Sequence, residues 1–377
     1  MLMYKYICAL HCRSGDFGWT HIMADGTIAP ATKVQDIITT YRPTKLFQPS
    51  APGPAYTSID FDDSGEFLLL SRTDDTIQLF NTKAGAYAKE LKSQKYGSAL
   101  ARFTHHSTSI IYASTKGDDG IRYLSMHDNS FIRYFRGHTA RVTSLALSPS
   151  ADSFLSASLD GTVKLWDCRS QNAHGELKFE DPWLTAYDPS ASVIAIASPP
   201  AQTVLLYDLK NYDKPPFASF DLLDVEKRFA HFGQRPGEGW TGLEFSTNGK
   251  YLLVSTNGPG HYVLDAFSGD LVHYLRRPSG ATNHLAPSDP LATAASAYTQ
   301  TDACLTPDGR YVVGGNGAQT GLLVWDLFAK EKGDRVLEPL AELPSQKTAA
   351  VVAYDPRFNL VASAEREVVL WLPDLDL

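Results

Sequence analysis

Apolar and polar residues alternate in short runs along most of this chain, and short turns rich in Asp, Gly, Ser and Pro separate the runs. The stretch VTSLALSPSADSFLSASLDGTVKLWD, Val142 to Asp167, holds three such runs, divided by a Ser-Pro turn and an Asp-Gly turn. An Asp-Gly turn between alternating apolar runs is a strong hairpin signal. The stretch therefore predicts three antiparallel strands.

The three-strand pattern recurs along the chain. Its third run contains a bulky residue, and this position is occupied by Phe80, Leu124, Trp166, Tyr207, Leu264, Trp325 and Trp371. Four of the intervals between these residues are 41 to 46 residues long, and the other two are 57 and 61. Seven copies of one unit indicate a propeller, because each small sheet buries its faces only by stacking on its neighbours.

A fourth strand follows the bulky position in every copy except the last, as in AYAKELK from Ala86 and SFIRYFRG from Ser130. The last copy has no room for one, yet TTYRPTKLF, Thr39 to Phe47, precedes the first copy and belongs to none. If this early strand completes the last sheet, the ring closes and an exposed strand edge is removed. We therefore predict an all-β, seven-bladed propeller closed by an N-terminal strand.

The repeats also divide the chain. Residues 1–33 match no copy and are interpreted as a disordered extension, and residues 34–377 as a single propeller. The two long intervals arise from insertions near 222–239 and 276–301. Both follow a fourth strand and precede a first strand, so we expect them on the same side of the ring, which we name the insertion-bearing face.

Composition narrows the ligand classes. With 34 Lys plus Arg against 42 Asp plus Glu, the chain lacks the positive excess that drives nucleic-acid binding, and no direct nucleic-acid site is expected. Its four scattered cysteines favour a reducing compartment, and no apolar run is long enough for a membrane span. Cys8, His11 and Cys12 are potential zinc ligands, but no second pair follows at a matching spacing. We predict no metal and no cofactor.

The copy from His138 to Trp166 carries a constellation of polar residues. His138 precedes its first strand, Ser156 and Ser158 lie on the second, Asp160 lies in the turn and Trp166 on the third. A chain of hydrogen bonds through these side chains would rigidify the blade. Ser, His and Asp are also the residue types of a hydrolase triad, but the copy has no Gly-x-Ser-x-Gly elbow. We interpret the set as structural.

Two other motifs have plain structural interpretations. Gly314-Gly315-Asn316-Gly317 lacks the Gly-Lys-Ser/Thr ending of a phosphate loop and is predicted to be a hairpin turn. Arg133 lies within an outer fourth strand, where it is expected only to solvate an edge. Arg136 and Arg141 flank the Gly-His turn on the insertion-bearing face, where guanidinium groups suit carboxylate or phosphate.

Gly-His, Ser-x-Asp and Trp-Asp motifs that recur about every 40 residues are typical of WD-repeat propellers. More specifically, KYGSALARFTHHSTSIIYAS, DDGIRYLSMHDNSFIRYFRGH, WTGLEFSTNGKYLLVSTNG and the ending LWLPDLD resemble the Swd-two family of WD-repeat proteins. The resemblance covers about residues 39 to 377. It includes the loop sequences SMHDN and NYDKPPF, which the general WD repeat does not require. It implies a non-enzymatic nuclear scaffold.

The resemblance also implies partners. One is the SET-domain methyltransferase subunit of COMPASS, the complex that methylates lysine four of histone three. The other is the scaffold subunit of a phosphatase-containing cleavage and polyadenylation or termination complex, and family members are linked to the phosphorylated tail of RNA polymerase II. A generic WD-repeat adaptor of another assembly and a propeller hydrolase are the alternatives.

A propeller presents variable loops on a rigid ring, which suits extended peptide ligands. We expect short segments of larger subunits to bind the insertion-bearing face. The candidate contact residues are Asp74, Tyr96, Asp118, Arg136 and Arg141.

Overall fold

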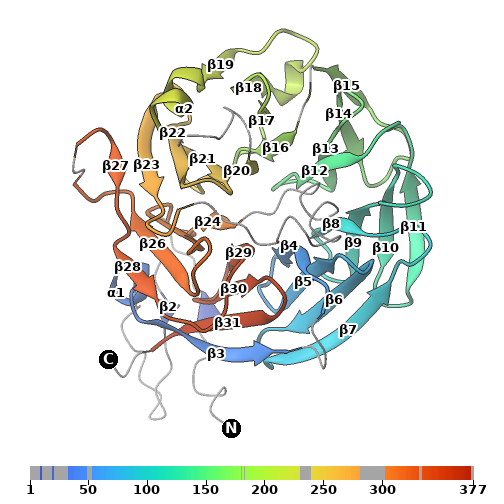
Figure 1. Cartoon of the computed structure of the whole chain (residues 1–377). Coiled ribbons are helices and arrows are strands. Elements are labelled where there is room, and N and C mark those ends of the chain that lie inside the picture. Colours follow the sequence, from blue (N-terminus) through green and yellow to red (C-terminus); the bar gives the residue numbers. More distant parts are fainter. Residues whose placement is uncertain are drawn as a thin grey trace.

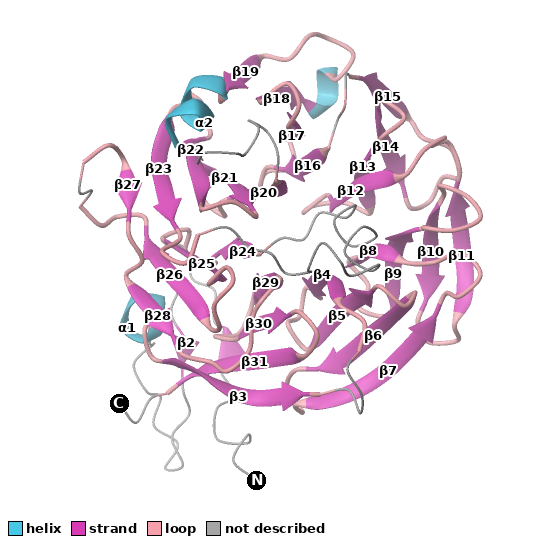
Figure 2. Ribbon diagram, viewed as in Figure 1, coloured by secondary structure: helices cyan, strands magenta, loops and turns pink. Residues whose placement is uncertain are grey.

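The computed structural model describes residues 33–48, 53–179, 181, 183–229, 239–280, 302–330 and 333–374. It also describes the backbone of two short antiparallel strands, β1 (Ala9–Leu10) and β2 (Trp19–Thr20). The expected disorder of residues 1–33 and the candidate metal ligands Cys8, His11 and Cys12 otherwise lie outside the described residues. Seven sheets surround a central axis (Figures 1 and 2).

Each blade contains four antiparallel strands, of which the first lies innermost (Figure 1). Blade 1 consists of β4 (Tyr56–Phe61), β5 (Phe67–Arg72), β6 (Thr76–Asn81) and β7 (Ala86–Lys92). Blade 2 consists of β8 (Ala99–Phe103), β9 (Ser109–Ala113), β10 (Ile121–Ser125) and β11 (Ser130–Phe135). Blade 3 consists of β12 (Val142–Leu147), β13 (Ser153–Ser158), β14 (Thr162–Asp167) and β15 (Gly175–Lys178).

The remaining blades follow the same plan. Blade 4 consists of β16 (Leu184–Tyr187), β17 (Val193–Ser198), β18 (Thr203–Asp208) and β19 (Ala218–Asp221), with the short 3-10 helix η2 (Leu209–Asn211) between the last two. Blade 5 consists of β20 (Trp240–Phe245), β21 (Tyr251–Thr256), β22 (Gly260–Asp265) and β23 (Leu271–Arg276). Blade 6 consists of β24 (Ala303–Leu305), β25 (Tyr311–Gly315), β26 (Leu322–Asp326) and β28 (Ala341–Leu343).

Blade 7 confirms the predicted closure. It consists of β29 (Val351–Tyr354), β30 (Val361–Ala364), β31 (Val368–Pro373) and the early strand β3 (Tyr41–Phe47). β3 pairs antiparallel with β31, from Tyr41 opposite Pro373 to Phe47 opposite Val368. Tyr41 is buried, and the Phe47 ring lies 4.7 Å from the ring of Phe80 in blade 1. The strand therefore completes blade 7 and also contacts blade 1, with the short helix α1 (Val34–Ile37) just before it.

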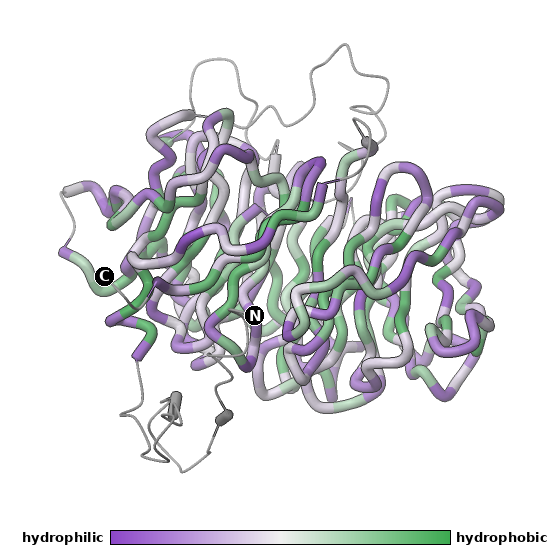
Figure 3. The backbone as a smooth tube through the Cα atoms, turned by 90° about the horizontal axis from the view of Figure 1, so that it is seen from below, coloured by the Kyte–Doolittle hydropathy of each residue, from purple (hydrophilic) through white to green (hydrophobic). Residues whose placement is uncertain are grey.

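Apolar packing between blades forms the core. Trp166, Trp325 and Trp371, at the bulky position of the repeat, are all fully buried. In the side view of Figure 3, hydrophobic stretches lie within the thickness of the ring and hydrophilic ones gather at the turns on its two faces. This distribution follows from strands that are buried on both sides and turns that contact water.

Polar bonds repeat from blade to blade at one position of the outer strand. Lys89 donates to the carbonyl of Met126, Arg133 to that of Cys168, and His273 Nε2 to that of Leu327 at 2.8 Å. In each case the acceptor belongs to the next blade. The expectation that Arg133 only solvates an edge was therefore wrong, because its guanidinium joins blade 2 to blade 3.

The structure adds detail at the insertions. The first contains helix α2 (Leu223–Phe229), whereas residues 281–301 of the second lie outside the described residues. The ends of the second are held by the buried pair Arg277 and Asp302, with Nη2 2.7 Å from Oδ2. A fifth strand, β27 (Val336–Leu337), comes from blade 6 and pairs parallel with β23. The four-strand repeat did not predict it.

The predicted Gly-rich hairpin turn is displaced along the chain. Gly314 and Gly315 end β25, and the turn before β26 begins at Asn316. Gly315 fits in the strand because a side chain there would meet the carbonyl oxygen of Ala349. Gly315 therefore serves the close approach of blades 6 and 7, and Gly317 lies in the turn.

Removal of β3 tests the closure. A chain that begins at residue 49 lacks Tyr41 and the partner of β31, so we expect Tm to fall by about 10 °C or more and the exposed edge to cause association. The control begins at Lys33 and should keep the Tm of the full chain. Differential scanning calorimetry and light scattering measure both; equal Tm values for the two truncations would contradict the closure.

Candidate partner-binding face

A chain of hydrogen bonds runs through blade 3. His138 Nδ1 lies 2.8 Å from Asp160 Oδ2, His138 Nε2 lies 2.6 Å from Ser156 Oγ, and Trp166 Nε1 donates to that same Oγ at 2.8 Å. A carboxylate only accepts, an indole N–H only donates and burial favours the neutral imidazole, and these three facts together fix the proton positions. Nδ1–H donates to Asp160, and the Ser156 hydroxyl donates to Nε2. The imidazole is neutral, and burial lowers the pKa of His138 in spite of Asp160.

Ser158 lies beside this chain of bonds and not within it. Its hydroxyl donates to the carbonyl of Ala140 at 2.8 Å and accepts from the backbone N–H of Asp160 at 3.2 Å. It therefore holds the turn that carries Asp160. Ser156, the serine that meets the imidazole, is 0% exposed, so it cannot reach a substrate. This geometry is structural and argues against a catalytic triad at His138, Ser156 and Asp160.

Ser156→Ala tests the network. The substitution leaves the buried Nε2 of His138 and the indole N–H of Trp166 without partners, so we expect the free energy of unfolding to fall by about 2–3 kcal/mol. Ser363→Ala is the matched control, since Ser363 accepts one indole N–H, from Trp371 at 2.9 Å. Urea unfolding should show a loss about half as large for the control. Equal losses would contradict the account.

The candidate contact residue Asp74 lies in the turn between β5 and β6. Its carboxylate accepts from Thr76 Oγ1 at 2.6 Å and pairs with Arg72 at 3.3 Å. Its carbonyl accepts from Gln94 Nε2 at 3.1 Å, and Gln94 precedes Tyr96 by two residues. Asp74 of blade 1 is thus tied to the connection that enters blade 2.

Tyr96 and Asp118 meet through Arg122, a residue that the sequence reasoning missed. Arg122 Nη2 lies 2.8 Å from each carboxylate oxygen of Asp118. Its guanidinium carbon lies 3.4 Å from the centroid of the Tyr96 ring, and the residue is only 2% exposed. Burial and stacking make this a strong cation-π contact. Phe131 and Tyr134 complete the surroundings, with ring centroids 5.8 and 5.1 Å from the same carbon.

We name Tyr96, Asp118, Arg122, Phe131 and Tyr134 the blade-2 cluster. Arg136 adjoins it, since its guanidinium lies 5.7 Å from the centroid of the Tyr134 ring, and its side chain is exposed. Arg141 lies in the connection to β12, where its carbonyl accepts from the N–H of Leu159 at 3.0 Å. This bond places Arg141 beside the turn that follows β13 in blade 3. The structure therefore assembles four of the five candidate residues around blades 1 and 2.

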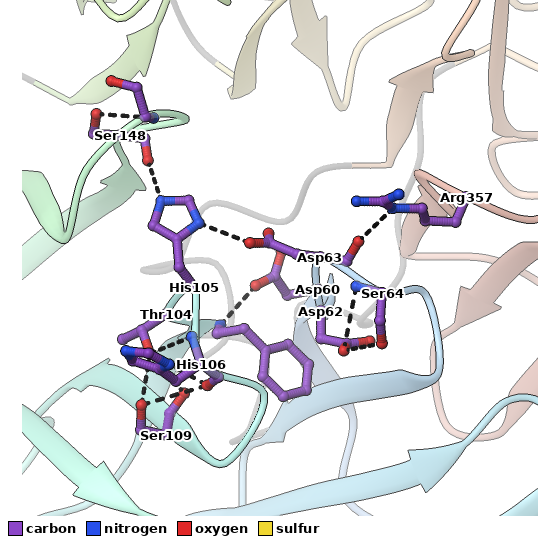
Figure 4. Close-up of polar contacts among 12 residues, drawn as sticks. Asp60, Asp62, Asp63, Ser64, Thr104, His105, His106, Ser109, Ser148 and Arg357 are labelled. Atoms are coloured by element: carbon purple, nitrogen blue, oxygen red, sulfur yellow. Dashed lines mark hydrogen bonds and ion pairs between the residues drawn. The ribbon is translucent and has the colours of Figure 1, made fainter. Parts of the chain in front are cut away.

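The opposite face carries a second histidine arrangement, shown in Figure 4. His105 lies in the turn after β8, with Nδ1 2.7 Å from Asp63 Oδ2 and Nε2 2.9 Å from the carbonyl of Ser148. Both partners only accept, so the two bonds form together only when both ring nitrogens carry protons, and the site therefore favours the imidazolium form. From blade 7, Arg357 Nε donates to the carbonyl of Asp63 at 2.8 Å. These contacts join the turns of blades 7, 1, 2 and 3.

His105 makes stability depend on pH. Partial burial lowers its pKa, but the hydrogen bonds to Asp63 and Ser148 raise it by more, so the pKa lies above its ordinary value. Its stabilising contribution is therefore complete below about pH 6.5 and is lost as the pH rises through the raised pKa. We expect His105→Gln to destabilise by about 1 kcal/mol at about pH 6 and by less at about pH 8.5.

His138→Gln is the control for that experiment, because the lowered pKa of His138 reverses the sign. Its substitution should become more destabilising over the same rise in pH. Urea unfolding at the two pH values measures both variants. Parallel trends for the two histidines would contradict the assignment of a cation at His105 and a neutral ring at His138.

The described residues contain no group of three or more His, Cys, Asp or Glu side chains placed to hold a metal ion. None of the helices in this part of the chain is long and apolar enough to cross a membrane.

Comparison with known proteins agrees with this architecture. Residues 129–167 match the family model described as WD domain, G-beta repeat. Together with the seven blades and the His138 network, this match defines a WD-repeat β-propeller.

Curated relatives cover almost the whole chain. Set1 complex component swd2 of Schizosaccharomyces pombe is 35% identical over 368 residues, which cover 89% of this chain and 98% of the relative. WD repeat-containing protein 82 of Drosophila melanogaster is 33% identical, with 90% and 96% covered. COMPASS component SWD2 of Saccharomyces cerevisiae is 34% identical, with 89% and 96% covered. The chain belongs to the Swd2 and WD repeat-containing protein 82 family, as its loop sequences indicated.

Proposed function

We propose that this chain is a nuclear, non-catalytic scaffold subunit of a COMPASS-type complex that methylates lysine four of histone three. The observation that carries the proposal is similarity over nearly the full length to two relatives named as components of Set1 and COMPASS complexes. The buried Ser156 supports a non-catalytic role, because the Ser-His-Asp set of blade 3 is occupied with structural hydrogen bonds.

The insertion-bearing face binds peptide segments of larger subunits, among them the SET-domain subunit. The blade-2 cluster supports this assignment because Arg122, Phe131 and Tyr134 lie on strands β10 and β11, and two bonds of 2.8 Å fix the pair of Arg122 and Asp118. Asp118 keeps 39% of its side chain exposed while it pairs with Arg122, and Arg136 is exposed beside it. A prearranged surface loses less entropy when it binds an extended peptide.

We also propose that the chain is a subunit of a second complex. The resemblance of the loop sequences to the Swd-two family favours a second partner. This partner is the scaffold subunit of a phosphatase-containing cleavage and polyadenylation or termination complex. Arg136 and Arg141 would suit a phosphorylated peptide such as the tail of RNA polymerase II, since guanidinium groups pair well with phosphate. A generic WD-repeat adaptor of another assembly is the alternative, and the identity of the bound subunits distinguishes it.

The test is recovery of partners from nuclear extract by the full chain, identified by mass spectrometry. A change of Asp74 or Asp118 to a cationic residue would place a second positive charge beside the buried guanidinium of Arg72 or Arg122. Both aspartates are therefore changed to Asn. The variant combines these with Arg136→Glu and Arg141→Glu. We expect recovery of the SET-domain subunit to fall at least tenfold, because the charge pattern of the face is lost.

The control is Arg169→Glu, in the turn between β14 and β15 on the opposite face, where the side chain is 81% exposed. It should leave recovery unchanged, and both variants should keep the Tm of the parent chain to within a few degrees. Unchanged recovery with the four-site variant would remove the face assignment. Absence of a SET-domain subunit among the proteins bound to the parent chain would remove COMPASS membership.

A further inference from the structure

The outer strands of blades 2 and 5 are close repeats of each other. Residues 131–136 read FIRYFR and residues 271–276 read LVHYLR, with Tyr and Arg at the same two positions. Tyr134 pairs with the third strand of its blade as Tyr274 does, and both ladders shift register at the same place. Arg133 and His273, at the same position of the two strands, each donate a hydrogen bond to a backbone carbonyl of the next blade. Because the registers agree, the outward backbone groups also correspond.

In blade 5 this outer edge is occupied by another segment of the chain. β27 pairs parallel with β23, with Val336 opposite Tyr274 and Leu337 opposite Leu275. The N–H of Tyr274 donates to the carbonyl of Arg335 at 2.8 Å. The next residue of the added segment, Glu338, pairs with Arg276 at 3.1 Å. The blade thus shows how an extended segment with two apolar residues and a carboxylate adds to this kind of edge.

In blade 2 the corresponding edge is open. Within the described chain no strand pairs with the outer side of β11, and no carboxylate there pairs with Arg136. Phe131 and Ile132 are 38% and 46% exposed on this strand. Proteins usually protect such an edge with charge, proline or a covering segment, and an open apolar edge is a template for strand addition.

Blade 1 shows what a charge-protected edge looks like in this repeat. At the positions of Tyr134 and Arg136, its outer strand β7 carries Glu90 and Lys92. The Lys92 ammonium lies 3.5 Å from the Glu90 carboxylate, so the cation already has a partner within its own strand. Arg136 has Tyr134 in that place and keeps its charge available for another chain.

We propose that the outer edge of β11 receives an extended segment of a partner subunit as a parallel strand. Two apolar residues of that segment lie opposite Tyr134 and Phe135, and an acidic residue follows them and pairs with Arg136. The site continues the blade-2 cluster, because the rings of Phe131 and Tyr134 belong to both. This inference rests on the proposed function for the identity of the partner but not for the location of the strand.

The probe is a synthetic peptide with the sequence of residues 333–340, GDRVLEPL, capped at both ends. Amide hydrogen exchange of the full chain is followed by NMR with and without millimolar peptide. The Tyr134 amide should exchange as an exposed edge in the free chain and at least tenfold more slowly with peptide. The Tyr274 amide should be protected in both states, because it already donates to Arg335.

Charge exchange locates the ion pair. Arg136→Glu should weaken peptide binding at least tenfold, and the peptide with Lys in place of Glu338 should bind this variant better than the parent peptide does. Arg169→Glu is the control with an equal change of charge on the opposite face, and it should bind the parent peptide as the unmodified chain does. Recovery of binding by the paired changes excludes misfolding as the reason for the loss.

Protection confined to blade 5, or no protection of β11 at millimolar peptide, would overturn the strand addition. The same exchange measurement on the chain bound to the recovered SET-domain subunit is the second readout, and an unprotected Tyr134 amide there would also overturn it. If recovery of that subunit still depends on the face while Tyr134 stays unprotected, the proposed function stands and the strand addition fails.

Discussion

The structure depends on stacking between blades, because a four-stranded sheet of this composition cannot bury both faces alone. The pairing of β3 with β31 makes the stacking continuous, since it joins the two ends of the described chain in one sheet. Tyr41 and Phe47 then pack where blades 6, 7 and 1 meet. Once the ring is closed, the turns on both faces are held at fixed positions, which a binding surface requires.

Most of the fold could be predicted because a repeat multiplies weak signals. A single run such as TVKLWD is ambiguous, but seven runs with a bulky residue at nearly constant spacing determine strand order, blade number and closure. The His138 network could be predicted for the same reason, since its His, Ser, Asp and Trp belong to the motifs of the WD repeat. β27 could not, because a two-residue strand from an irregular loop has no period to reveal it.

The candidate binding face was harder to predict, because its residues come from separate turns and strands. Arg122 resembles an ordinary strand residue in IRYLS, and only its burial between Tyr96 and Asp118 reveals that it organises the cluster. The protonation of His105 likewise depends on two acceptors from distant turns. Sequence spacing identifies residues within a blade, whereas contacts between blades require the closed ring.

The contacts between turns join the blades on the opposite face, and the insertion-bearing face is the one that we propose meets larger subunits. Cross-linking of the purified assembly with a lysine-reactive reagent tests this division most directly. Lys95 and Lys116 are exposed beside the blade-2 cluster, and Lys83 is exposed in a turn of the opposite face. The account predicts that cross-links to the SET-domain subunit start from Lys95 and Lys116. Cross-links to that subunit from Lys83 and from neither of the other two would contradict it.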